Sequence, residues 1–302
     1  MQKIFSISND GSHKVVYLFG LKLKFKSKYL EQCAEIKKLN KKLKKSAKQL
    51  NKMQQCLSGI ENHYLNRILP SIEKEKFSVI IPTLQKNTDI LNMLVESLIE
   101  DDFVDEILII DNSLKGGLTY NSQKVKILPV EENLFVYPAW NYGIEKMKNG
   151  YFALLNDDLL LPKNFFAQVS DFIKNTPECG LVGLESSTVI NEKDKNFDEY
   201  PPSSLLLFKP IKAIHAEHNY YWGSAIFGRK ENYYETPQNM LVWFGDDYLI
   251  LKNNVQNKTC YAIYNTSIKH YGSLSSKNPK LDEIKKRDGE IYKKFEHSLI
   301  NK

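Results

Sequence analysis

The order of apolar and polar residues divides the chain into three parts. In the first, residues 1–28, the apolar run from Val15 to Phe19 is followed by strict alternation with lysine from Leu21 to Lys26. A period of two is typical of a strand with one buried face, and lysines on the other face discourage further pairing. We therefore expect an N-terminal strand pair ending in an edge strand. The alternative is a strip that lies on an anionic membrane surface.

The second part, residues 29–75, has a period of seven. Two series of residues repeat at this spacing: Ile36, Leu43, Leu50, Leu57 and Tyr64, and, three positions further along, Leu39, Ser46, Met53, Ile60 and Arg67. This pattern predicts a long lysine-rich helix that is a candidate coiled coil. Two interpretations stay open: the helix packs on the rest of the chain, or residues 36–67 form a homo-oligomer. Pro70 and the charged residues 73–76 end this part.

In the third part, residues 76–302, apolar runs alternate with stretches of helical spacing. The runs are residues 77–83, 107–110, 125–129 and 151–155, and the helical stretches are residues 89–99 and 137–148. Continuous apolar strands separated by helices predict an α/β fold, in which a mostly parallel, Rossmann-like central sheet carries helices on both faces. Ligands of such sheets bind beyond the carboxyl ends of the strands.

The charge is distributed unevenly. The chain of 302 residues carries a net charge of +6, but the segment 22–52 alone holds twelve lysines against two acids, or +10, which leaves −4 for the remainder. A slightly acidic body argues against a nucleic-acid-binding core, and the segment lacks interleaved stacking aromatics, so we expect no nucleic-acid partner. An anionic membrane surface is the expected partner of residues 22–52.

The four cysteines, Cys33, Cys56, Cys179 and Cys260, lie far apart and contain no CxxC pair. Structural disulfides and a thiolate zinc site are therefore not expected. No apolar run reaches the roughly 18 to 20 residues that a bilayer-spanning helix needs. Together these features predict a cytoplasmic protein, soluble or peripheral at the inner face of the membrane.

Two adjacent carboxylates, Asp157 and Asp158, follow the apolar run 151–155. Without a partner they repel, and one of them is driven towards protonation. A divalent hard cation such as Mg²⁺ or Mn²⁺ relieves this repulsion, because it prefers carboxylate and phosphate oxygens. The alternative is that one of them caps the next helix.

Several further motifs lie in a fixed order around this pair: Ile80-Ile81-Pro82-Thr83, Asp111-Asn112-Ser113, Asn133, Asn141-Tyr142-Gly143, Asp246-Asp247 and His270. In this order and spacing the chain resembles the glycosyltransferases of GT-A fold, and most closely the large inverting family two. The resemblance extends from about Phe77 to Ser276, two thirds of the chain. It implies a GT-A domain over residues 76–302.

The resemblance also implies a site for a nucleotide-sugar, with a UDP-sugar expected. Pro82, Thr83 and Asp111 would line the base and the ribose, and Asn133, Asn141 and Asp157 would belong to the same site. Asn156 stands where the family normally has the aspartate that bonds a ribose hydroxyl. Asparagine can still donate or accept there, so binding is expected to survive while the identity of the nucleotide stays open.

Asp158 occupies the metal-binding position of the family motif, and His270 resembles the second protein ligand of Mn²⁺ or Mg²⁺. Asp246 and Asp247 match the acidic pair that supplies the catalytic base of inverting transfer, with Asp246 slightly favoured. The alternative for this pair is a structural helix cap. Leu249, Ile250 and Lys252 depart from the commonest family pattern, which puts one contact to donor or acceptor in doubt.

Tyr220, Tyr221, Trp222 and Gly223 form an aromatic cluster beside a glycine. Aromatic faces stack on sugar rings, so Trp222 and Gly223 are candidates for the sugar site. A buried core cluster is the alternative, and the same two interpretations apply to Trp140.

The resemblance thus implies a metal-dependent, inverting glycosyltransferase, a hexosyl- or N-acetylhexosaminyltransferase. It would act on a surface-glycan or lipid-linked acceptor of the lipopolysaccharide type. Two other functions have less support from the sequence. A nucleotidyltransferase of similar fold normally has a glycine-rich loop after its first strand, and residues 83–87 contain no glycine. A non-enzymatic coiled-coil scaffold carrying a nucleotide-sugar-binding domain is the other.

Overall fold

The computed structural model describes residues 5–10, 13–18, 21–26, 28–68, 74–185, 189–191, 200–211, 222–271 and 280–300. The chain divides into two compact units, Met1–Tyr64 and Leu65–Lys302, and each is described here by itself. Pro70 and Glu73 at the predicted boundary, and Tyr220 and Tyr221 of the aromatic cluster, lie outside the described residues.

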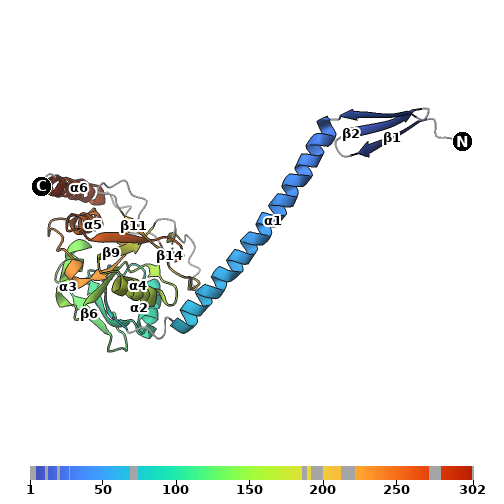
Figure 1. Ribbon diagram of the computed structural model, residues 1–302. Helices are drawn as coiled ribbons and strands as arrows, with labels where there is room; N and C mark the ends of the chain where they lie inside the picture. The colour runs from blue at the N-terminus through green and yellow to red at the C-terminus, as the bar shows by residue number, and fades with distance from the viewer. Residues whose placement is uncertain are drawn as a thin grey trace. The chain divides into compact units, whose positions relative to one another are not determined.

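The N-terminal unit is an antiparallel sheet followed by one long helix (Figure 1). The sheet has the order β1 (Phe5–Asp10), β2 (His13–Leu18), β3 (Leu21–Lys26), with β3 at an edge as expected. The predicted strand pair is confirmed, and β1 adds a third strand. β1 was not predicted because its residues, FSISND, contain no continuous apolar run. Helix α1 covers Lys28–His63 and continues into a π-helical turn, Tyr64–Ile68.

The second unit is built on an eight-stranded sheet with the order β11-β13-β9-β12-β7-β4-β5-β6. Its strands are β4 (Phe77–Thr83), β5 (Val104–Asp111), β6 (Val125–Pro129), β7 (Tyr151–Leu155), β9 (Cys179–Leu184), β11 (Phe208–Ile211), β12 (Ala225–Arg229) and β13 (Thr259–Ile263). Neighbouring strands from β7 to β6 run parallel, whereas β12 is antiparallel to both of its neighbours. The predicted α/β fold with a mostly parallel central sheet is confirmed.

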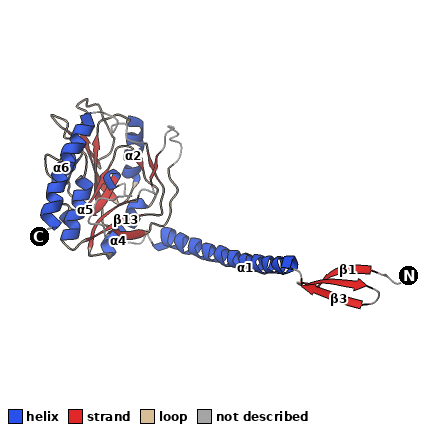
Figure 2. Cartoon of the chain, turned by 90° about the horizontal axis from the view of Figure 1, so that it is seen from above, coloured by secondary structure: helices blue, strands red, loops and turns tan. Residues whose placement is uncertain are grey.

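Helices cover both faces of this sheet (Figure 2). They are α2 (Thr88–Glu100), α3 (Tyr137–Lys146), α4 (Phe165–Asn175), α5 (Gly245–Val255) and α6 (Lys280–Ile300). On one face the ring of Phe77 contacts Phe166 of α4. On the other, α3 approaches β4 so closely that a Cβ at Gly143 would lie 2.4 Å from the Ile80 side chain. Phe77 and Ile80 point to opposite faces because successive strand residues alternate.

A second, small sheet with the order β10-β14-β8 lies beside the large one. It contains β8 (Leu159–Leu160), β10 (Val189–Asn191) and β14 (Ile268–His270). The antiparallel pairing of β8 with β14 places His270 opposite Leu159. A segment near the C-terminus is thereby brought next to the Asp157-Asp158 pair.

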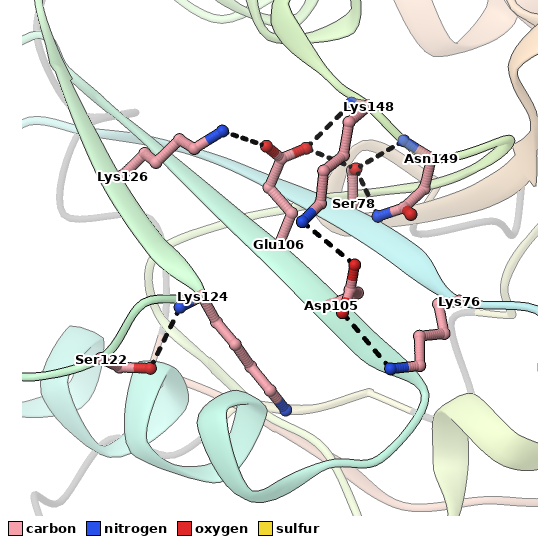
Figure 3. A network of polar contacts seen from close by, with 9 residues as sticks. All are labelled: Lys76, Ser78, Asp105, Glu106, Ser122, Lys124, Lys126, Lys148 and Asn149. Atoms are coloured by element: carbon pink, nitrogen blue, oxygen red, sulfur yellow. Dashed lines mark hydrogen bonds and ion pairs between the residues drawn. The ribbon is translucent and has the colours of Figure 1, made fainter.

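A polar network fastens the amino-terminal ends of the parallel strands, away from the strand ends where ligands are expected (Figure 3). Its centre is the buried Glu106 of β5, which accepts hydrogen bonds from Ser78 Oγ and Lys126 Nζ, each at 2.7 Å, and from the Lys148 N–H at 3.0 Å. Burial opposes ionisation of Glu106, but these hydrogen bonds outweigh it and hold its pKa below the usual range. The network therefore links β4, β5, β6 and the entry to β7.

Among the helices described, none combines the length and apolar character that a membrane-spanning segment requires.

Candidate active site

The site is built where β4, β5 and β7 end side by side. The parallel register places Thr83 opposite Asp111, with Pro82 opposite Ile110. Thr83 Oγ1 donates to Asp157 Oδ2 over 2.6 Å and accepts the backbone N–H of Gln85 at 2.9 Å. Three segments that are far apart in sequence thus meet at one edge of the sheet.

Asp111 is held in the ionised form at this edge. Its Oδ1 accepts Ser113 Oγ at 2.5 Å, and its Oδ2 accepts Gln85 Nε2 at 3.0 Å. Although burial opposes ionisation, these hydrogen bonds lower the pKa of Asp111 below its usual range. A fixed carboxylate beside an open strand end can accept hydrogen bonds from hydroxyl or imide groups of a ligand.

Asp157 and Asp158 lie in a tight turn directly after β7. The chain then continues into β8, and helix α4 starts only at Phe165 with Asn164 at its N-cap. The helix-cap interpretation of this pair is therefore wrong. Burial raises the pKa of Asp157 to about 6, the Thr83 hydrogen bond opposes the rise, and the charge of Asp158 adds to it. The expected electrostatic conflict between the two carboxylates is present.

Asp158 and His270 converge on one point. His270 Nε2 lies 3.2 Å from Asp158 Oδ1, and both side chains are largely buried. The backbone joins them as well, because the Tyr271 N–H donates to the Asp158 carbonyl at 2.9 Å. Within the part of the chain that the structure describes, no group of three or more His, Cys, Asp and Glu side chains is placed to hold a metal ion. A carboxylate oxygen and an imidazole nitrogen nevertheless fit a cation whose other ligands are phosphate oxygens and water.

Asp246 and Asp247 lie in the first turn of α5, after a residue with strained backbone. Phe244 has φ 68°, which is rare for a residue with a side chain, and a Cβ at Gly245 would lie 2.5 Å from the Tyr137 ring. The Tyr137 hydroxyl donates to Asp246 Oδ1 at 3.2 Å. Burial and the neighbouring charge of Asp247 raise the pKa of Asp246 to about 6, although the Tyr137 bond opposes the rise.

The other carboxylate oxygen of Asp246 borders Gly223. A Cβ at Gly223 would lie 3.4 Å from Asp246 Oδ2, so the glycine leaves space beside that oxygen. The next residue, Ser224, accepts the Asn156 N–H on its carbonyl at 3.0 Å. The short 3₁₀ helix Trp222–Ser224 therefore connects the acidic pair of α5 with the strand end that carries Asp157 and Asp158.

Sequence reasoning missed Asp288, which supports this turn from helix α6. Its Oδ2 accepts three consecutive backbone N–H groups, those of Leu241 at 3.1 Å, Val242 at 2.8 Å and Trp243 at 3.0 Å. The Asp288 side chain is fully buried. Nothing in the local sequence indicates this role, since Asp288 follows Lys285, Lys286 and Arg287 in a helix that reads as surface. Only the helical spacing offers a signal, because it places this acid on the side of the helix that faces the core.

Asn133 and Asn141 make internal hydrogen bonds. Asn133 Oδ1 accepts the Phe135 N–H at 2.8 Å. Asn141 Oδ1 accepts the Tyr233 hydroxyl at 2.6 Å and the Thr236 N–H at 3.0 Å, while its Nδ2 donates to the Thr236 carbonyl. In the part of the chain that the structure describes, neither residue forms a hydrogen bond with Thr83, Asp111 or Asp157. Asn141 thus anchors the loop after β12, and its predicted contact with the nucleotide would require these bonds to be exchanged.

The buried Asn112 belongs to the motif Asp111-Asn112-Ser113 but received no role of its own from the sequence. Its amide donates to the Phe135 carbonyl at 2.8 Å and accepts the Leu134 N–H at 3.1 Å. It therefore fixes the segment after Asn133 to the end of β5.

Trp222 and Trp140 are buried, each with 1% of its surface exposed. The Trp222 ring covers Gly183 of β9, where an added Cβ would overlap the indole. This burial favours the core interpretation for both tryptophans over stacking on a sugar. Gly223 remains at the site through its position beside Asp246.

Comparisons with known proteins agree with this architecture. The family model described as Glycosyl transferase family 2 matches residues 78–236, more than half of the chain. The match includes the β4, β5 and β7 strand ends and Gly223, and it stops before Asp246, Asp247 and His270. No curated protein matches the chain.

Among solved structures, S. aureus TarS 1-349 is 15% identical, with a TM-score of 0.45, over 65% of this chain and 60% of that one. GalNAc-T7 with UDP, GalNAc and Mn²⁺ is 14% identical, with a TM-score of 0.49, over 68% of this chain and 45% of that one. The chain thus spans less than two thirds of the length of either protein.

Proposed function

The chain belongs to glycosyl transferase family 2, and we propose that it transfers a sugar from a UDP-sugar to an acceptor hydroxyl with inversion at C1. One observation carries the proposal. Asp246, a carboxylate whose pKa is raised to about 6, is connected through Gly223 and Ser224 to the strand end that bears Asp158. A base for the acceptor and an anchor for the donor diphosphate are both required for this reaction, and the proposal assigns them to these two groups.

The donor nucleotide is proposed to bind at the ends of β4 and β5. Asp111 and Thr83 are fixed by hydrogen bonds there, and Pro82 adds a rigid, half-buried surface. Asn156 follows β7 within the same edge and offers an amide that both donates and accepts. Asp157 is proposed to orient this strand end through its bond with Thr83.

Asp158 and His270 are proposed to hold a divalent cation, Mn²⁺ or Mg²⁺. The cation would supply positive charge to the diphosphate as the bond to C1 breaks. Asp158 Oδ1 and His270 Nε2, which lie 3.2 Å apart, would be the two protein atoms that face the ion.

Asp246 is proposed as the base. Inverting transfer needs a carboxylate that removes the acceptor proton as the hydroxyl oxygen attacks C1 and the nucleoside diphosphate departs with the bonding electrons. Tyr137 fixes Oδ1, and Oδ2 is left beside Gly223. Asp247 would orient the first turn of α5 and raise the pKa of its neighbour by its charge.

The acceptor is proposed to be a surface-glycan or lipid-linked hydroxyl of the lipopolysaccharide type at the cytoplasmic face of the membrane. Support comes from the basic segment 22–52, whose lysines suit an anionic lipid surface. Whether the sugar is a hexose or an N-acetylhexosamine would depend on the donor that the site selects.

A thermal-shift screen tests the donor. A selected nucleotide-sugar should raise Tm in proportion to the logarithm of its concentration, and more so with Mn²⁺, because ligands stabilise the state that binds them. UDP-sugars are expected to exceed the GDP-, CMP- and dTDP-sugars. Equal and metal-independent shifts for all of them would contradict a selective donor site.

Replacing Asp288 by alanine should lower turnover by about 10- to 100-fold with little change in the donor KM. The three N–H groups before the acidic pair would lose their acceptor, and each unsatisfied buried group costs about 1–3 kcal/mol. Steady-state kinetics with donor and acceptor varied separately measures the split between kcat and KM.

Asp288→Asn keeps an acceptor oxygen and should recover most of the activity. Glu290→Ala, which removes an exposed acid from the same helix, should behave like the wild type. An unchanged kcat in a folded Asp288→Ala enzyme, or a loss confined to the donor KM, would remove the supporting role of Asp288.

A further inference from the structure

Helix α1 presents an apolar seam that no described residue of its own unit covers. The seam residues are Ile36, Leu39, Leu43, Leu50, Met53, Leu57 and Ile60, and each is between 55% and 66% exposed. They occupy the two heptad positions that face a partner in a coiled coil. Ser46 is the polar member of the same seam over this stretch.

Such a helix is poorly stabilised on its own. α1 is 36 residues long, and helices in water derive most of their stability from packing an apolar face. A periodic pattern of this length is typical of a helix whose partner is another helix. Covering the seven apolar side chains in a pair would bury roughly 1,400 Å² in total, which lies in the range of specific protein interfaces.

The lysines of α1 avoid the seam. Of the eight lysines between residues 36 and 52, seven occupy heptad positions on the side away from it: Lys37, Lys38, Lys41, Lys44, Lys45, Lys48 and Lys52. Only Lys42 flanks the seam. The other flanking positions from 40 to 56 are uncharged: Asn40, Ala47, Gln49, Gln54 and Cys56. The net charge of +10 on residues 22–52 suggests that two copies of α1 would repel each other. Because most of these lysines point away from the seam, the repulsion at the contact is small.

A parallel pair in register fits the flanking and seam residues. In a parallel pair in register, a flanking residue faces the residue five positions later on the other helix, which joins Lys42 with Ala47 and Gln49 with Gln54. None of these contacts sets like charges against each other. Ser46 meets Ser46 of the other helix, whereas a shifted register would place its hydroxyl against leucine or methionine. A single polar seam residue is a known means of fixing register.

We propose that α1 pairs with α1 of a second copy of this chain in a parallel, in-register, two-stranded coiled coil. The lysines then lie on the outside of the pair. One helix thereby separates two functions, with assembly on the seam and contact with anionic surfaces on the opposite side.

The full chain tests this by light scattering coupled to gel filtration. The expected mass is twice the 35.0 kDa of one chain, and it should persist at high salt. Leu43→Glu combined with Leu50→Glu should yield a monomer. The matched outer-face variant, Lys41→Glu combined with Lys48→Glu, should stay dimeric. A monomeric wild type, a trimer or tetramer, or a seam variant that remains dimeric would overturn the proposal.

Cysteine cross-linking tests the register. In a background with Cys33→Ser and Cys56→Ser, Ser46→Cys should form a disulfide-linked dimer under mild oxidation, whereas Lys48→Cys should not. Cross-linking at Lys48→Cys but not at Ser46→Cys would overturn the parallel, in-register arrangement. A wild-type monomer whose seam variants lose stability would instead show that α1 packs on its own catalytic unit.

Discussion

Replacing Asp246 by asparagine is expected to reduce the rate of sugar transfer by about 10²–10⁴-fold, the range typical of losing a positioned general base. The amide cannot accept the acceptor proton, while its shape preserves the contact with Tyr137. Binding of the donor should change little, because the donor diphosphate is assigned to Asp158 and His270. Initial rates at saturating donor measure the loss, and donor-induced Tm shifts measure the binding.

The pH dependence provides a second readout of the same group. A base works only when ionised, and the pKa of Asp246 is raised to about 6, so kcat/KM of the wild type should fall as pH decreases through about 6. The residual activity of Asp246→Asn should not show this fall at acidic pH. Asp247→Asn is the matched control and should lose less. A larger loss in Asp247→Asn than in Asp246→Asn would move the base to Asp247.

Removing the Asp158 carboxylate is expected to have the next largest effect. Asp158→Ala should lower turnover by about 10²–10³-fold, because charge stabilisation by a metal ion contributes several kcal/mol and each 1.36 kcal/mol is a factor of ten. Mn²⁺ titration at fixed donor should show a weakened apparent metal affinity. His270→Ala should shift the same titration by a smaller amount.

A chelator should reproduce the loss in the wild type and add nothing in Asp158→Ala. Glu145→Ala, at an exposed position, is the control for removing an acid. Turnover that ignores both the chelator and the Asp158 substitution would contradict a metal held at this point.

Most of the fold could be predicted because its central strands, such as β4 and β7, are buried on both sides. The strands 77–83, 125–129 and 151–155 have the predicted bounds, and the helix predicted over 89–99 corresponds to Thr88–Glu100. A continuous apolar run shows where a buried strand begins and ends. The antiparallel insertion of β12 between β7 and β9 was not predictable from the pattern, since strand order depends on contacts distant in sequence.

The residues of the candidate site also differ in whether the sequence alone could place them. Residues at the strand ends, such as Thr83 and Asp111, could be placed together from sequence because parallel strands end at one edge. The contact between Asp158 and His270 depends on the pairing of two short strands, β8 and β14, that carry no strong local signal. Asp288 acts through backbone N–H groups of another segment, and a pattern of side chains does not reveal such contacts.

Sugar transfer with inversion can be observed by following one UDP-sugar with ³¹P and ¹H NMR in the presence of the wild-type chain, Mn²⁺ and a glycan acceptor. We expect the bond between C1 and the diphosphate to break, so that UDP accumulates while an α-linked donor yields a β-linked product. Cleavage between the two phosphorus atoms would indicate nucleotidyl transfer instead. If the protein binds UDP-sugars and acceptors but leaves every donor intact, it is a binding domain, and the proposed sugar transfer is wrong.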